Sequence, residues 1–121
     1  MSRTNAINTL VGIRIVVGAL SWLVPRPAGK LFGLDAKGNP QAPYLARLFG
    51  VRDIALAYGA VSSEGEQQRQ WLTVGLACDV ADSVAGIAGG RRGYLPKFAS
   101  VLVTATALGA AALGAVALSQ E

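Results

Sequence analysis

Ionisable side chains stand near the middle of three stretches that are otherwise apolar. Arg14 lies in the first stretch, Arg52 and Asp53 in the second, and Asp79 and Asp82 in the third. One such side chain at the centre of a lipid bilayer costs roughly 2.5–3.5 kcal/mol on insertion scales, so these residues need partners inside the protein. We therefore predict that the three stretches pack together with their charged groups turned inward.

The five charged residues are expected at a similar depth, where two arginines can meet three aspartates. The planar guanidinium of arginine binds carboxylates through paired hydrogen bonds. We predict that Arg14 or Arg52 bridges Asp79 and Asp82. Two interpretations of this network stay open. It is either an ionic clasp that fixes how the helices pack, or a site for a proton or a ligand.

The composition offers little for catalysis. The chain has no His and a single cysteine, Cys78, so it lacks the commonest metal ligand and the usual general base. No His or matched Lys is present to activate the Ser and Thr residues of the apolar stretches. We expect no enzyme activity, no metal site and no cofactor. The net charge of +4 does not indicate nucleic-acid binding, because most of the basic residues lie in two short loops.

The elements that must position these charges are four apolar segments, at residues 7–24, 44–61, 71–89 and 96–118. Each is close to the ~20 residues that cross a hydrocarbon core. Hydrophobic residues make up 52% of the 121 residues and charged residues 15%, against about 25% charged in an ordinary soluble domain. The mean hydropathy is +0.43. We predict an all-α fold, an antiparallel four-transmembrane-helix bundle in one membrane domain over residues 1–121. A soluble helical bundle is the alternative.

Small residues recur at helical spacing in the last two segments. The alanines of residues 71–89 repeat every four positions, and two glycines flank the acids on one helix face. Such rows let helices approach closely in lipid. The predicted helix-packing residues are Gly75, Ala77, Ala81, Ala85, Gly86, Ala110 and Gly114.

Basic residues are concentrated in the loops that follow the first and third segments. They are Arg26, Lys30 and Lys37 in the first of these loops, and Arg91, Arg92 and Lys97 in the other. The positive-inside rule puts both loops in the cytoplasm and both termini outside. We expect a multi-pass protein of a bacterial cytoplasmic (inner) membrane, with the second basic set near lipid headgroups.

The first loop also contains an apolar patch beside Lys30, formed by Phe32, Gly33 and Leu34. These residues predict an amphipathic first loop. Phe32 and Leu34 either dip into the lipid interface or cap the end of the helix bundle, and both alternatives stay open.

The run RLFGVRDIALAYG at residues 47–59 is similar to a signature of small bacterial and fungal membrane proteins, the DUF4267 family. The Phe-Gly-Leu element at residues 32–34 and the acids Asp79 and Asp82 in the third segment resemble the same pattern. The likeness extends from the first segment through the third. It implies a four-helix integral membrane protein and supplies no activity.

Two functions remain open from the sequence. The first is a non-enzymatic accessory or assembly subunit that docks, through the small-residue faces of the last two segments, against a larger membrane protein or a second copy of itself. The second is a minimal proton-coupled transporter, or a lipid or small-molecule binding protein, that uses Arg52 and the three aspartates. Membrane lipids are expected partners in either case.

Overall fold

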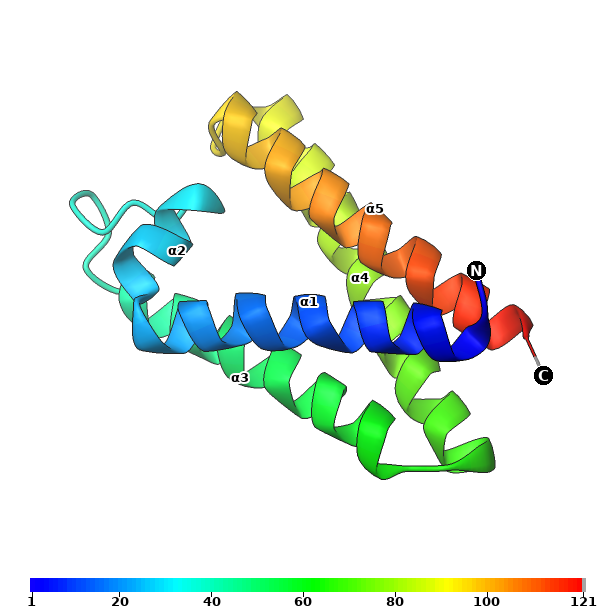
Figure 1. Ribbon diagram of the computed structural model, residues 1–121. Helices are drawn as coiled ribbons and strands as arrows, with labels where there is room; N and C mark the ends of the chain where they lie inside the picture. Colours follow the sequence, from blue (N-terminus) through cyan, green and yellow to red (C-terminus); the bar gives the residue numbers. More distant parts are fainter. Residues whose placement is uncertain (121) are drawn as a thin grey trace.

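The computed structural model describes residues 1–120, which fold into five α-helices and contain no β-strand (Figure 1). The helices are α1 (Arg3–Leu23), α2 (Pro25–Leu31), α3 (Ala42–Ser62), α4 (Gly65–Arg92) and α5 (Lys97–Ser119). The predicted all-α class is therefore confirmed. The four predicted segments correspond to α1, α3, α4 and α5.

The helix α4 extends beyond the predicted segment at both ends. Residues 65–70 are polar, but Glu, Gln and Arg are good helix formers and need no apolar face to continue a helix. At the other end, α4 runs through Gly89 and Gly90 and stops at Gly93, which has a φ of +82°. Glycine adopts this left-handed conformation without steric cost. The apolar pattern therefore marked only the middle of α4.

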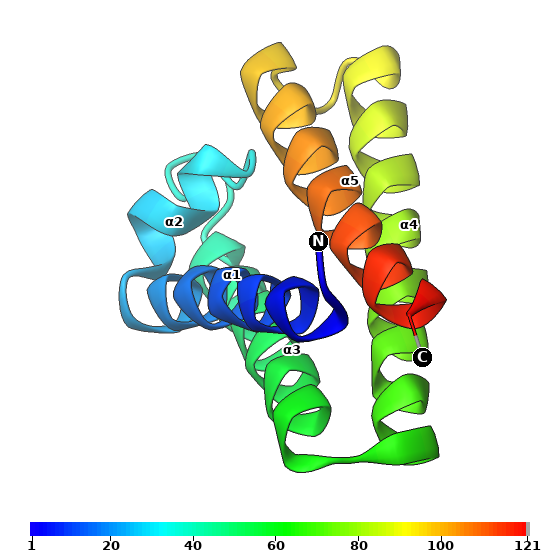
Figure 2. The same cartoon turned by 45° about the vertical axis from the view of Figure 1, so that its right-hand side comes forward.

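The start of the predicted first loop forms the short helix α2. Pro25 stands at its first position, where the missing N–H leaves no hydrogen bond unmade and the fixed φ suits a helix. Lys30 lies in the last turn, where a positive charge is favourable. The helix α2 and the loop after it lie over the end of α1 and the beginning of α3 (Figures 1 and 2).

The four long helices form two pairs of oppositely running neighbours, α1 with α3 and α4 with α5 (Figures 1 and 2). The pairs cross, and they converge at the end that carries both termini (Figure 1). The hydrophobic core lies at this end. Its buried members are Ala6, Ile7, Leu10, Val11, Ala57, Ala60, Leu72, Ala110 and Ala117. Toward α2 the two pairs diverge.

Two glycines bring the backbones of α1 and α3 into contact. A Cβ atom on Gly18 would lie 2.8 Å from the carbonyl oxygen of Gly50, and one on Gly50 would lie 2.6 Å from the carbonyl oxygen of Gly18. Neither position has room for a side chain. Arg14 precedes Gly18 by about one helical turn, and Asp53 follows Gly50 by about one turn. The crossing therefore places these two charged residues beside each other.

Large apolar side chains cover much of the outside of the molecule, whereas many buried residues are small or charged. Exposed examples are Val16 and Leu20 in α1, Val80 and Val84 in α4, and Val101 and Leu108 in α5. Buried positions include many alanines and glycines together with Arg14, Asp53 and Asp79. An apolar exterior around buried charged residues is consistent with a membrane protein.

Within residues 1–120, three helices are long and apolar enough to cross a membrane, namely α1, α4 and α5. The helix α3 has a similar length but carries three charged residues, Arg47, Arg52 and Asp53. The helix α3 is therefore long enough to cross a membrane, but its charged residues make it less apolar than the other three long helices.

Candidate functional site

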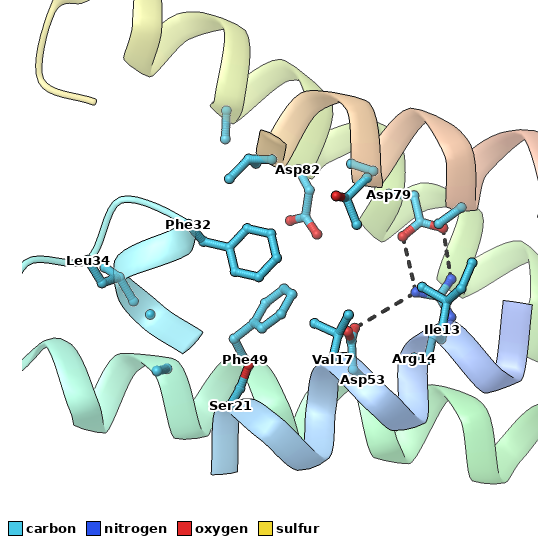
Figure 3. Close-up of a pocket in the computed structure, with 17 residues that line it drawn as sticks. Ile13, Arg14, Val17, Ser21, Phe32, Leu34, Phe49, Asp53, Asp79 and Asp82 are labelled. Atoms are coloured by element: carbon cyan, nitrogen blue, oxygen red, sulfur yellow. Dashed lines mark hydrogen bonds and ion pairs between the residues drawn. The ribbon is translucent and has the colours of Figure 1, made fainter. Parts of the chain in front are cut away.

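A cavity of about 250 Å³ lies beyond the core, where the two helix pairs diverge (Figure 3). Each helix contributes to its wall, for example Val17 from α1, Gly29 from α2, Phe49 from α3, Ala85 from α4 and Val103 from α5. Most of this wall is apolar. Four charged residues border the same space, namely Arg14, Asp53, Asp79 and Asp82.

Phe32 and Leu34 close the cavity at the α2 end (Figure 3). The ring centroid of Phe32 lies 6.1 Å from that of Phe49. Gly33 stands between the two capping residues with a φ of +91°, and a Cβ atom there would collide with Leu95. Of the two alternatives for the first loop, the structure favours the cap over the lipid-inserted segment, because both side chains face the protein interior.

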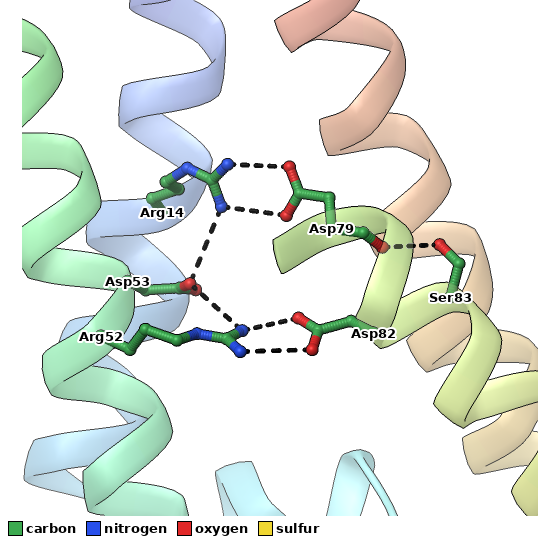
Figure 4. Close-up of polar contacts among 6 residues, drawn as sticks. All are labelled: Arg14, Arg52, Asp53, Asp79, Asp82 and Ser83. Atoms are coloured by element: carbon green, nitrogen blue, oxygen red, sulfur yellow. Dashed lines mark hydrogen bonds and ion pairs between the residues drawn. The ribbon is translucent and has the colours of Figure 1, made fainter. Parts of the chain in front are cut away.

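Arg14 and Asp79 form the most deeply buried ion pair. Arg14 Nη1 donates to Asp79 Oδ1 at 3.1 Å, and Nη2 donates to Oδ2 at 2.8 Å (Figure 4). The two side chains are only 6% and 4% exposed. Both oxygens of this carboxylate are thus satisfied by one guanidinium, and the pair joins α1 to α4.

Arg52 and Asp82 form a second pair with the same geometry, which joins α3 to α4. Arg52 Nη1 donates to Asp82 Oδ1 at 3.2 Å, and Nη2 donates to Oδ2 at 2.6 Å (Figure 4). This pair is more accessible, with the side chains 35% and 28% exposed. The Arg52 guanidinium also lies 4.8 Å from the centre of the Phe49 ring. Its Nε is buried and has no hydrogen-bond partner in the described part of the chain.

Asp53 lies between the two pairs and makes longer contacts. Its Oδ1 is 3.8 Å from Arg14 Nη1 and 3.9 Å from Arg52 Nη2 (Figure 4). The side chain is 7% exposed, and no hydrogen bond reaches its carboxylate from residues 1–120. Two guanidinium groups therefore face three carboxylates, and one negative charge is left in excess at the border of the cavity.

The structure brings all five predicted network residues together but corrects their pairing. We predicted that one arginine bridges Asp79 and Asp82, whereas each arginine binds its own aspartate. Side chains three positions apart on a helix diverge by about 60°. Asp79 therefore points toward α1 and Asp82 toward α3, beyond the reach of one guanidinium. The residue that contacts both arginines is Asp53.

Gly75 provides the space for the Arg14 guanidinium. A Cβ atom on Gly75 would lie 2.8 Å from Arg14 Nη2. The glycine precedes Asp79 by about one turn of α4, so the guanidinium passes close to Gly75 where it reaches the carboxylate. Ser83, one turn after Asp79, donates its hydroxyl to the Asp79 backbone carbonyl at 2.8 Å and leaves the carboxylate free for Arg14.

The predicted helix-packing residues divide into two groups. Gly75, Gly86, Ala110 and Gly114 are buried between helices, whereas Ala77, Ala81 and Ala85 are exposed on α4. Because these three alanines are exposed in the described part of the chain, their helix-packing role remains a prediction about contact with another protein. Gly18 and Gly50, where the backbones of two helices meet, were not among the predicted residues. Gly18 follows Arg14 by four residues and Gly50 precedes Asp53 by three, and this spacing on one helix face is the sequence signal that could have identified them.

Arg91, Arg92 and Lys97 are exposed at the turn between α4 and α5. Arg91 and Lys97 border a shallow groove between these helices, whose floor includes Ile87, Val101 and Leu108. Contact with lipid headgroups stays a prediction for these three residues.

In the described part of the chain, no group of three or more His, Cys, Asp or Glu side chains is arranged to hold a metal ion. Comparison with known protein families, with curated proteins and with solved structures finds no match to this chain. The resemblance to the DUF4267 family therefore remains a prediction.

Proposed function

We propose that this chain is a non-enzymatic integral membrane protein that binds a small amphipathic molecule in the cavity between its two helix pairs. The observation that carries this proposal is the cavity of about 250 Å³, which is bordered by the buried Asp53 carboxylate, to which no side chain or backbone group of residues 1–120 donates a hydrogen bond. Binding sites for small molecules are typically apolar hollows with a few polar groups that fix orientation. In this proposal the Arg14–Asp79 and Arg52–Asp82 pairs hold the helix pairs around that space.

The distribution of apolar side chains supports placement in a membrane. Large apolar residues face outward on α1, α4 and α5, and the charged residues face one another. We propose that α1, α3, α4 and α5 all span a bacterial inner membrane as two antiparallel pairs, with both termini outside. In this arrangement α3 crosses because Arg52 is paired with Asp82 of α4 and because Asp53 faces Arg14 of α1, at a longer distance, and not the lipid.

Cell fractionation checks this placement. The protein produced in bacteria is expected in the membrane fraction, and it should stay there after a wash with high salt or alkaline carbonate, because apolar helices and not surface charge hold it. A periplasmic reporter at the C-terminus should be active and a cytoplasmic one inactive. Recovery of folded protein in the cytosol would contradict the membrane placement and all that follows from it.

A second function is favoured by one specific observation, the exposed row of Ala77, Ala81 and Ala85 on α4. Small residues at this spacing permit close approach of another transmembrane helix. Docking to another membrane protein, or to a second copy of the chain, would use this face. All three alanines are exposed on α4, and Ala85 also borders the cavity.

Access to the cavity can be measured by thiol labelling in lipid nanodiscs. We choose Thr106→Cys, a nearly isosteric change at the cavity wall, in a Cys78→Ala background. The neutral reagent methyl methanethiosulfonate is expected to label this thiol much faster than an Ala6→Cys thiol, because Ala6 is fully buried in the core. Labelling proceeds by thiolate attack on the reagent sulfur, so its rate reports arrival of a small molecule at that point.

A filled cavity supplies the control. Val17→Phe places a ring in the cavity and should slow labelling of Thr106→Cys to the rate of the core thiol. Val16→Phe makes the same change one position away on the exposed side of α1 and should leave the rate unchanged. If Val17→Phe and Val16→Phe have equal effects, the labelling reagent does not travel through this cavity and the proposed binding site is wrong.

A further inference from the structure

Of the three carboxylates at the cavity, that of Asp53 differs from those of Asp79 and Asp82 in its contacts. Asp79 and Asp82 each receive two hydrogen bonds from their own arginine. Asp53 receives none from the described residues, and both arginines that flank it already use their Nη atoms in those pairs. A carboxylate has about four lone-pair positions that accept hydrogen bonds. Asp53 is therefore a buried carboxylate that can still accept hydrogen bonds.

Burial makes this arrangement costly unless a further donor or cation arrives. A buried charge that lacks a close partner is unfavourable because it has lost its hydration. Each arginine is shared with an aspartate at shorter distance, so neither fully neutralises Asp53. The space beside Asp53 is the cavity itself (Figure 3). A ligand in that space can supply both a positive charge and N–H donors.

The size and lining of the cavity limit the rest of such a ligand. A dry engineered cavity of about 150 Å³ holds benzene, so a larger space admits a ring or a short alkyl chain with a small head. Phe32, Leu34 and Val103 line the part where an apolar body would lie. An anionic head is disfavoured, because Arg14 and Arg52 are paired with Asp79 and Asp82, so that Asp53 is the charge in excess at the cavity and like charges repel.

From this geometry we propose that the cavity binds a monovalent organic ammonium ion, with Asp53 as its counter-ion and the apolar body between Phe32 and Val103. The inference rests on the proposed function, since it names the ligand class of the same cavity. The ammonium donates to the Asp53 carboxylate, and the network then carries no net charge. No covalent step is involved.

Paired labelling reagents of opposite charge test the ligand class. Aminoethyl methanethiosulfonate carries an ammonium, and sulfonatoethyl methanethiosulfonate carries a sulfonate on the same spacer. At Thr106→Cys, the ratio of cation to anion labelling rates is expected to exceed that at Ser62→Cys, an exposed position at the end of α3, by about tenfold or more, since a charged cleft concentrates counter-ions. Because both reagents attack the same thiolate, its reactivity cancels in the ratio.

The matched variant Asp53→Asn removes the charge and keeps the shape. It should lower the ratio at Thr106→Cys to that at Ser62→Cys, while labelling by the neutral methyl reagent continues. A ratio that stays high in Asp53→Asn would assign the cation preference to Asp79 or Asp82 and overturn the role of Asp53. A ratio that is already low in the parent chain would show that Asp53 is neutral in the membrane, and the ammonium proposal would be wrong.

A competition experiment tests the ligand class without a substitution at Asp53. Hexylammonium, hexanol and hexanoate share one apolar chain and differ in the charge of the head. Hexylammonium is expected to protect Thr106→Cys from the neutral reagent, with hexanol weaker and hexanoate without effect. Equal protection by all three would leave the cavity as an apolar binding site and end the ammonium proposal. Absence of neutral labelling from the start would instead contradict the proposed function itself, so the two failures are distinguishable.

Discussion

Replacement of Arg14 by methionine is expected to lower the free energy of unfolding by about 3–5 kcal/mol, the usual cost of removing one partner from a buried ion pair. Methionine retains much of the apolar stem of arginine and removes the charge. Asp79 then loses both of its arginine hydrogen bonds, and Asp53 loses one of its two cationic neighbours. Unfolding of the purified protein by a denaturing detergent, with helicity followed by circular dichroism, measures the change.

The second ion pair provides a matched comparison. Arg52→Met makes the same replacement in a pair whose side chains are 35% and 28% exposed, and Asp82 borders the cavity, where water can solvate the remaining carboxylate. Its effect should be smaller than that of Arg14→Met, since the carboxylate that is left is less desolvated than Asp79. The double variant Arg14→Met, Asp79→Leu should recover much of the loss, because it removes the pair and leaves only Asp53 with a weakened contact. If Arg14→Met lowered the free energy of unfolding no more than Arg52→Met does, burial would not determine how much each ion pair contributes to stability.

The crossing of α1 and α3 should be equally intolerant of added volume. Gly50→Ala is expected to destabilise the protein by about 1–3 kcal/mol, as overpacking in a closed interior does. The new methyl group would lie 2.6 Å from the Gly18 carbonyl oxygen and 3.2 Å from the Trp22 backbone nitrogen. Backbone atoms cannot rotate away as a side chain can, so relief requires separation of the helices. The same detergent unfolding assay reports the loss.

Gly12 supplies the control for this substitution. It lies in α1, and a Cβ atom there would meet nothing within 4 Å. Gly12→Ala is therefore expected to be neutral, or to stabilise the protein by up to about 1 kcal/mol through the better helix propensity of alanine. Only Gly50→Ala should thus lower the free energy of unfolding. If Gly50→Ala were as well tolerated as Gly12→Ala, the α1–α3 contact would be looser than its backbone distances indicate.

Periodicity and the cost of buried charge were enough to predict the all-α class and the inward position of the five charged residues. They were not enough to predict which arginine binds which aspartate. Arg14, Arg52, Asp79 and Asp82 satisfy the same rules of depth and face in either pairing. The choice depends on the Gly18–Gly50 crossing and on the different directions of the two acids on α4, which are properties of the assembled helices.

Two further features, the first turns of α4 and the cavity, could not be predicted from the sequence for other reasons. The polar residues 65–70 lack an apolar face, so the first turns of α4 gave no periodic signal although their propensity favours a helix. The cavity arises because the helix pairs diverge past the ion network, and no single segment encodes the divergence. The Phe-Gly-Leu patch was visible, but whether Phe32 faced lipid or protein depended on that same space.

The three charges of α3 bear on how the protein is made. A nascent α3 presented alone to a bilayer would bring Arg52 and Asp53 into hydrocarbon without Asp82 of α4, which pairs with Arg52, and without Arg14 of α1, which lies near Asp53. The α1 segment emerges first from the ribosome and already carries Arg14, whereas Asp82 follows only after α4 has been synthesised. Only residues 63 and 64 separate α3 from α4. Biogenesis would then require translocation machinery to retain α3 until α4 arrives, so that both integrate as one hairpin beside α1.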